Sequence, residues 1–139
     1  MIVLKGAEVS AKIREDVQKM LGELGGIIPK LAIVRVGENP DDLSYERGAV
    51  KKMENFGLRV QCYGFPADIE EETFLRELKS INEDGDIDGI LVLRPLPSHI
   101  SSKAVEEEIH PGKDLDGISP VNIAKVFSGD ETGFAPCTA

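Results

Sequence analysis

The chain has 139 residues, of which 41% are hydrophobic, so it is long enough to bury one core and too short for two ordinary domains. Its formal net charge is −9, with 25 acidic residues against 16 basic ones, which disfavours nucleic acid as a partner because phosphate-backbone binding needs clustered Lys and Arg. The longest apolar runs are far shorter than the ~20 residues of a membrane-spanning helix, and no secretory leader precedes them, so we expect a soluble, cytoplasmic protein that does not bind membranes.

The first quarter of the chain predicts a helix followed by a strand. Apolar residues recur every three or four positions over residues 9–24, which is typical of one face of an amphipathic helix, and Gly25-Gly26 ends it. Residues 31–36 are rich in β-branched side chains and predict a strand. The segment Gly37–Pro40 then stops that strand with a loop.

A second helix and a second strand follow. Asp41 or Asp42 is the expected N-cap of a helix that runs to about Phe56. Residues 58–65 predict the next strand. Because Cys62 lies within this apolar strand and has no partner at metal-ligand or C-x-x-C spacing, we expect it to be a buried small hydrophobic residue.

The third helix and third strand complete an alternating pattern. Asp68 and Glu71 approximate a capping box for a helix that ends within residues 82–86. Residues 87–93 are almost continuously hydrophobic, which suits a parallel strand buried on both faces. Strands that alternate with helices predict an α/β fold with a mainly parallel sheet between helices, in three α/β/α layers.

Ligands of such open sheets bind outside the carboxyl ends of the strands, which directs attention to three loops. The first carries Tyr45 into the start of a helix, although packing alone is an alternative explanation of this tyrosine. The second is residues 94–100, whose two prolines are also explained by loop stiffening. The third contains Asp114 and Asp116 in a D-x-D-G run, but it lacks the further carboxylates of an EF-hand, so we expect no metal site.

Together these loops resemble the methylenetetrahydrofolate dehydrogenase/cyclohydrolase family. The resemblance covers essentially the whole chain and rests on four motifs at consistent spacing: Val36–Pro40 with Tyr45, Asp88–Val92 with Pro95-Leu96-Pro97, Lys113–Gly117 with Pro120 and Asn122, and Phe134–Thr138. It implies that residues 1–139 are the N-terminal, folate-binding catalytic domain, and that a Rossmann-like NAD(P) domain is absent from this chain. It also implies a tetrahydrofolate derivative as ligand and a homodimer for the full-length protein.

The resemblance further assigns roles to residues. It implies that Tyr45 stacks on or hydrogen-bonds the folate and that Asp116 binds the polar edge of the pterin through charge-assisted hydrogen bonds. No G-x-G-x-x-G run follows a strand, so the sequence itself offers no cofactor-binding residues. The expected site residues are Tyr45 and Lys52 for catalysis, and Tyr45, Ala49, Val92, Leu93, Arg94, Pro97 and Asp116 for substrate binding.

Two positions depart from the family pattern. The family's catalytic lysine falls on Ala49, four residues after Tyr45, and the glutamine that supports it falls on Leu93. Lys52 comes seven residues after Tyr45, within ~20° on the same helix face, and is the remaining candidate amine. We therefore expect dehydrogenase chemistry with NAD or NADP in the full-length enzyme, doubtful methenyltetrahydrofolate cyclohydrolase activity, and an inactive isolated domain. The alternative is a regulatory folate-binding module that lost its chemistry.

Overall fold

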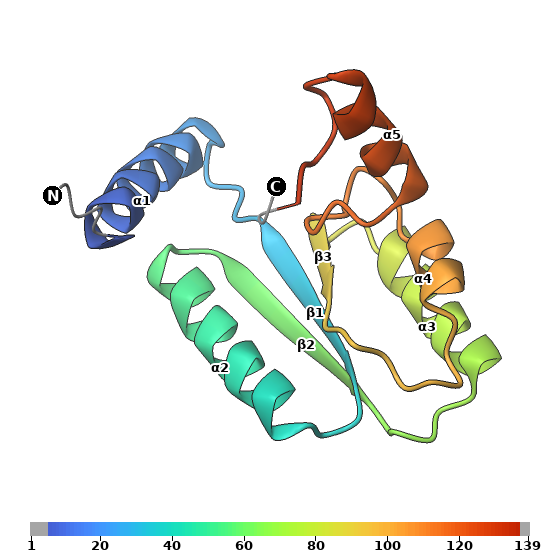
Figure 1. Ribbon diagram of the computed structural model, residues 1–139. Helices are drawn as coiled ribbons and strands as arrows, with labels where there is room; N and C mark the ends of the chain where they lie inside the picture. The colour runs from blue at the N-terminus through green and yellow to red at the C-terminus, as the bar shows by residue number, and fades with distance from the viewer. Residues whose placement is uncertain (1–5, 137–139) are drawn as a thin grey trace, which may run out of the picture.

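The computed structural model describes residues 6–136 and shows a parallel sheet between two helical layers (Figure 1). The three strands pair in parallel, in the order β2-β1-β3. The predicted α/β class and three-layer arrangement are therefore confirmed. The elements are α1 (Gly6–Glu23), β1 (Lys30–Val36), α2 (Pro40–Asn55), β2 (Arg59–Phe65), α3 (Glu71–Glu83), β3 (Gly89–Val92), α4 (Ser102–Glu108) and α5 (Pro120–Ser128).

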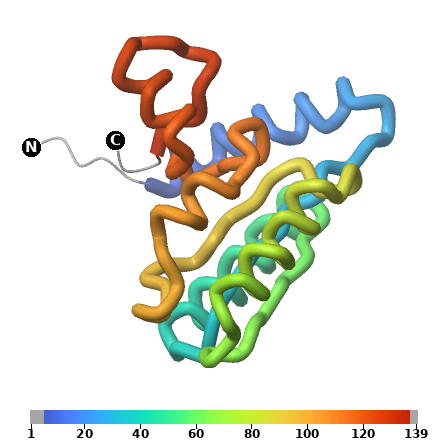
Figure 2. Tube along the Cα trace, turned by 90° about the vertical axis from the view of Figure 1, so that its right-hand side faces the viewer, coloured from blue at the N-terminus to red at the C-terminus, as the bar shows by residue number. Residues whose placement is uncertain are grey.

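The hydrophobic core lies on the face of the sheet that α3 and α4 cover (Figures 1 and 2). Alternate residues of β1 point into it, and Phe74 and Leu78 of α3 are fully buried against them. The ring of Phe74 meets that of Phe65 edge to face, with centroids 5.5 Å apart. Packing in this core holds the carboxyl ends of β1 and β3 in place.

The opposite face is covered by α2, and α1 lies beside the C-terminal end of α2, where Gln18 Nε2 donates to Phe56 O at 2.7 Å (Figure 1). Neither helix has a buried residue. Ile33 of β1 is nonetheless fully buried on this side. The predicted first helix is present, but its apolar residues Val9, Ile13 and Met20 are exposed. No helix in the described part of the chain is both long and apolar enough to cross a bilayer.

The predicted helix starts need correction. Asn39, not an aspartate, caps α2: its Oδ1 accepts the backbone N–H of Asp41, and Pro40 takes the first helical position. At α3 the cap residue is Glu70, which makes no side-chain capping bond. Glu71 is not part of a capping box, because its carboxylate accepts the backbone N–H of Ser101 instead.

The burial predicted for Cys62 is wrong, because the side chain is exposed. Within residues 6–136, strand β2 pairs on one side only, with β1, and so lies at the edge of the sheet. Cys62 pairs in register with the buried Ile33, yet its own side chain remains exposed at this edge. Cys137, in the terminal segment that the sequence left unplaced, lies outside the described residues.

Candidate functional site

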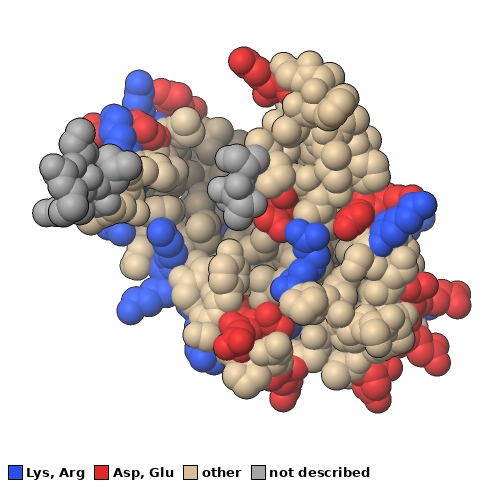
Figure 3. All heavy atoms as spheres, viewed as in Figure 1, with Lys and Arg blue, Asp and Glu red and all other residues tan. Residues whose placement is uncertain are grey.

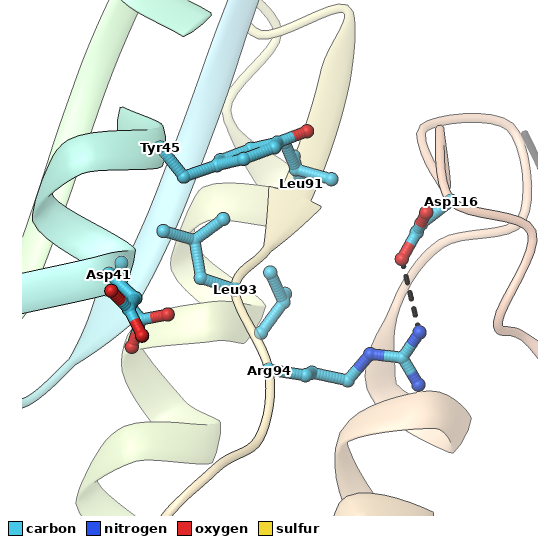
Figure 4. A pocket seen from close by; sticks show the side chains of 8 residues that line it. Asp41, Tyr45, Leu91, Leu93, Arg94 and Asp116 are labelled. Atoms are coloured by element: carbon cyan, nitrogen blue, oxygen red, sulfur yellow. Dashed lines mark hydrogen bonds and ion pairs between the residues drawn. The ribbon is translucent and has the colours of Figure 1, made fainter. Parts of the chain in front are cut away.

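A pocket of about 380 Å³ opens beside the carboxyl end of β3, between α2 and the loop that precedes α5 (Figure 4). Apolar side chains of β3 and its following loop form its middle, Tyr45 stands on one side and Asp116 on the other. This is the edge of the sheet at which parallel α/β folds bind ligands. The lining residues are Asp41, Asp42, Tyr45, Leu91, Val92, Leu93, Arg94 and Asp116.

Tyr45 reaches the pocket from the second turn of α2. The helix start is set by the Asn39 cap and by Pro40. An ion pair between Arg35 Nε of β1 and Glu46 Oε2 of α2, 3.1 Å long and largely buried, holds this turn against the sheet. Glu46 is the neighbour of Tyr45, so the pair holds the backbone that carries Tyr45 at the edge of the pocket. Tyr45 itself remains 58% exposed.

Arg94 and Asp116 face each other across the far side of the pocket. Arg94 Nη2 donates to Asp116 Oδ2 at 3.1 Å, and Arg94 Nη1 lies 3.9 Å from Glu106 Oε1 of α4 (Figure 4). The guanidinium therefore joins the loop after β3 to both α4 and the segment before α5. Only one oxygen of Asp116 is used by Arg94, which leaves Oδ1 available to a ligand.

The segment that carries Asp116 is attached to the sheet edge. Ile90 of β3 donates its backbone N–H to Lys113 O at 2.7 Å, and Ile90 pairs in a parallel bridge with Asp114. Two residues later on each segment come Val92 and Asp116, so the bridge sets their register. Because β1 lines the other edge of β3, this short segment occupies the position that a further strand would take.

The buried side chain of Asp114 stabilises the turn that follows Asp116. Its carboxylate is fully buried and accepts from Ile118 N at 3.1 Å, Ser119 N at 2.8 Å and Asn122 Nδ2 at 2.9 Å. Burial alone would raise the pKa of the Asp114 carboxyl, but the hydrogen bonds from Asn122, Ser119 and Ile118 outweigh it and hold that pKa below its ordinary value. The carboxylate is thus a structural anion that positions Asp116 and α5.

The turn itself requires a glycine. Gly117 has a φ of +64°, the left-handed region, and a Cβ at this position would lie 2.6 Å from the carbonyl oxygen of Phe134. The segment around Phe134 therefore packs directly on the turn. Asn122 ties the same segments together, since its Oδ1 accepts the backbone N–H of Phe134.

The pocket contains most, but not all, of the residues predicted from sequence. Tyr45, Val92, Leu93, Arg94 and Asp116 line it together. Ala49 is half-buried within α2, Pro97 lies further along the loop, and Lys52 is exposed; none of these three is in the lining. Lys52 is displaced because seven residues of helix carry it ~10 Å along the axis from Tyr45.

Three lining residues were missed. The sequence pattern indicated only a capping role for Asp41 and Asp42, although they precede Tyr45 by four and three residues and therefore share its helix face. Leu91 precedes Leu93 by two residues, the spacing that brings side chains to one face of an extended segment. Both signals were present in the sequence.

The described residues, 6–136, contain no group of three or more His, Cys, Asp or Glu side chains arranged to hold a metal ion. On the face shown in Figure 3, Lys and Arg side chains are interspersed with Asp and Glu.

Comparison with known proteins identifies the family of the chain. A family profile described as tetrahydrofolate dehydrogenase/cyclohydrolase, catalytic domain, matches residues 4–116. A bifunctional protein FolD of Clostridium kluyveri is 45% identical over 139 residues, covering 99% of this chain and 49% of the relative. FolD of Clostridioides difficile is 46% identical over 138 residues, covering 98% and 48%. The chain thus spans about half the length of the curated relatives it matches.

Solved structures show the same similarity. The bifunctional FolD methylenetetrahydrofolate dehydrogenase/cyclohydrolase of Campylobacter jejuni superposes with a TM-score of 0.89 at 34% identity, over 94% of this chain and 47% of that one. A Trypanosoma brucei dehydrogenase-cyclohydrolase, solved with NADP and an inhibitor, gives 0.89 at 29% identity over 99% and 48%. The chain therefore belongs to the tetrahydrofolate dehydrogenase/cyclohydrolase family, of which it carries the catalytic domain.

Proposed function

We propose that this chain is the folate-binding half of a methylenetetrahydrofolate dehydrogenase. The observation that carries the proposal is the pocket that Tyr45 and Asp116 line together, in a chain of this family. In the reaction, a hydride with its two electrons leaves the carbon that bridges two folate nitrogens and passes to NAD(P). We assign NAD(P) to a nucleotide-binding domain outside this chain, as part of a cytoplasmic homodimer.

The pocket residues supply orientation. The exposed ring of Tyr45 offers a flat surface on which the folate can stack, and the free Oδ1 of Asp116 can accept N–H groups of the pterin. Leu91 and Leu93 provide an apolar floor between them. Hydride transfer depends mainly on holding the two reactants in the correct geometry, and this is the role that we assign to these groups.

We propose that the full-length protein hydrolyses the methenyl product slowly. A cyclohydrolase needs a group that moves a proton and stabilises charge, which typically contributes ~10²- to 10⁴-fold. Ala49 and Leu93 offer neither a proton nor a hydrogen bond. Lys52 does not line the pocket and would have to reach it from a later helical turn.

The test uses the protein in which this chain is joined to its nucleotide-binding domain. We expect it to oxidise methylenetetrahydrofolate while hydrolysing methenyltetrahydrofolate slowly, and we expect Ala49→Lys combined with Leu93→Gln to raise hydrolysis more than either change alone. Wild-type hydrolysis as fast as oxidation would refute the assignment of these two positions. We also expect the 139-residue chain alone neither to bind nor to reduce NAD(P). Micromolar binding of NAD(P) in a calorimetric titration would refute the assignment of the cofactor to a domain outside this chain.

The apolar residues at Ala49 and Leu93 also favour a second candidate, a folate-binding module without chemistry. The same protein separates the two. A catalytic enzyme oxidises methylenetetrahydrofolate, whereas the module binds tetrahydrofolate with no turnover in the presence of either NAD or NADP.

A further inference from the structure

The pocket assigned to folate is lined by more negative than positive charge. Its acidic side chains are Asp41, Asp42 and Asp116, and its single cationic side chain is Arg94. That cation is already engaged, because it pairs with Asp116 at 3.1 Å and lies 3.9 Å from Glu106. The carboxylates of Asp41 and Asp42 therefore have no balancing cation in the lining.

The distribution of these charges matters as much as their number. Asp41 lies at the opposite end of the pocket from Arg94 and Asp116, with Leu91 and Leu93 between them (Figure 4). Apolar side chains contribute no counter-charge, so they do not offset the field of the aspartates in the middle of the pocket. Asp42 is half-buried and Asp41 is exposed, so Asp42 exerts the stronger field.

The proposed reaction changes the charge of the folate ring. Methylenetetrahydrofolate is neutral at the carbon that joins its two nitrogens. Loss of hydride to NAD(P) leaves a methenyl cation delocalised over the N–C–N unit, and the nicotinamide ring loses its own positive charge. Fixed negative charge stabilises both this cation and the transition state in which it develops.

We propose that this pocket selects the cationic methenyl form of the folate over neutral reduced folates, and that Asp42, assisted by Asp41, determines this preference. The inference rests on the proposed function, since it takes folate as the ligand. It also agrees with the slow hydrolysis proposed above. Hydrolysis removes the positive charge of the methenyl group, so a site that stabilises this cation and supplies no proton-transfer group retains the methenyl product.

The expected size of the effect follows from Coulomb's law. A carboxylate roughly 6 Å from the ring cation, at an effective dielectric constant of about 40, changes affinity by about tenfold, which corresponds to ~1.4 kcal/mol. The two aspartates act on the ring charge alone, because both forms of the folate carry the same glutamate tail. Added salt should reduce the preference.

The experiment measures dissociation constants of the 139-residue chain for methenyltetrahydrofolate and for tetrahydrofolate, by rapid titration before the cation hydrolyses. We expect the wild type to bind the cation at least ~10-fold more tightly. Asp42→Asn should remove most of that ratio and Asp41→Asn a smaller part, while Asp42→Glu should retain it. Glu54→Gln, an equal charge change at an exposed position near the other end of α2, serves as the matched control and should leave the ratio unchanged.

The outcomes separate this inference from the function on which it rests. Equal affinity for the two folates, or a ratio that Asp42→Asn and Glu54→Gln change alike, overturns the charge preference and leaves folate binding intact. Failure of the folded chain to bind either folate overturns the proposed function, and the preference with it. Circular dichroism of each variant establishes that the chain is folded.

Discussion

Replacing Asp114 by asparagine tests how the site is held in place. The side chain is fully buried and serves three donors: the backbone N–H groups of Ile118 and Ser119 and the side-chain amide of Asn122. Asparagine keeps one acceptor oxygen and turns the other into a donor. Whichever way the amide points, at least one buried donor then faces another donor.

The magnitude follows from the number of bonds affected. A hydrogen bond to a charged group contributes ~1.5–3 kcal/mol, and a buried donor left unsatisfied costs a similar amount, so we expect Asp114→Asn to lower the free energy of unfolding by about 2–4 kcal/mol. With a urea slope of ~2 kcal/mol per molar, the middle of the usual range, the unfolding midpoint should fall by about 1–2 M. A domain of this kind has only ~5–15 kcal/mol in total, so the change is readily measured.

The pH dependence gives a second readout. The pKa of the Asp114 carboxyl is lowered in the folded chain, so its stabilising contribution is present above the unfolded pKa of ~3.9 and is lost as pH falls through the folded value. Asp114→Asn should therefore flatten the acid limb of the stability profile.

Asp130→Asn is the matched control. Asp130 also accepts two local hydrogen bonds, from Thr132, but it is exposed, so we expect its replacement to leave the urea midpoint almost unchanged. A midpoint for Asp114→Asn within error of the wild type, or equal effects of the two substitutions, would refute the structural role of Asp114.

Three further predictions concern the pocket. Arg94→Leu removes the partner of Asp116, and because the pair is partly exposed we expect tetrahydrofolate affinity to fall only ~2- to 5-fold in a calorimetric titration; a loss of all binding would contradict this. Gly117→Ala should destabilise the chain to urea by ~2 kcal/mol or more, because φ is positive and the new Cβ would collide with Phe134 O, and wild-type stability would show that the turn adapts. Lys52→Ala should leave tetrahydrofolate affinity unchanged, since Lys52 does not line the pocket, and weaker binding would place its amine there.

The sequence predicted the alternating pattern well, because the buried strands β1 and β3 leave continuous apolar runs and amphipathic helices leave apolar residues every three or four positions. Helices α4 and α5 were missed. Helix α4 has only seven residues and buries only Val105. Helix α5 begins at Pro120, a residue that is also typical of loops. Their N-caps Ser101 and Ser119, each with a side chain that accepts a helix N–H, were the available signals.

The site was predictable in part for a similar reason. Tyr45 follows the end of β1 and Arg94 follows the end of β3, and the carboxyl ends of parallel strands meet at one edge of the sheet. The pairing of Arg94 with Asp116 depends on the isolated bridge that brings residues 113–115 beside β3, and no local pattern in the sequence specifies it. The exposure of Cys62 likewise depends on β2 being an edge strand, which strand order decides and composition does not.

The central claim is that the pocket between Tyr45 and Asp116 binds a reduced folate. Nuclear magnetic resonance titration of the isotope-labelled chain with tetrahydrofolate tests it most directly, since each backbone amide reports separately. The account predicts saturable shift changes concentrated at Tyr45, Leu93 and Asp116, with the amide of Ser80 on α3, outside this pocket, unaffected. Absence of saturable changes, or changes concentrated around Ser80 instead, would contradict the account.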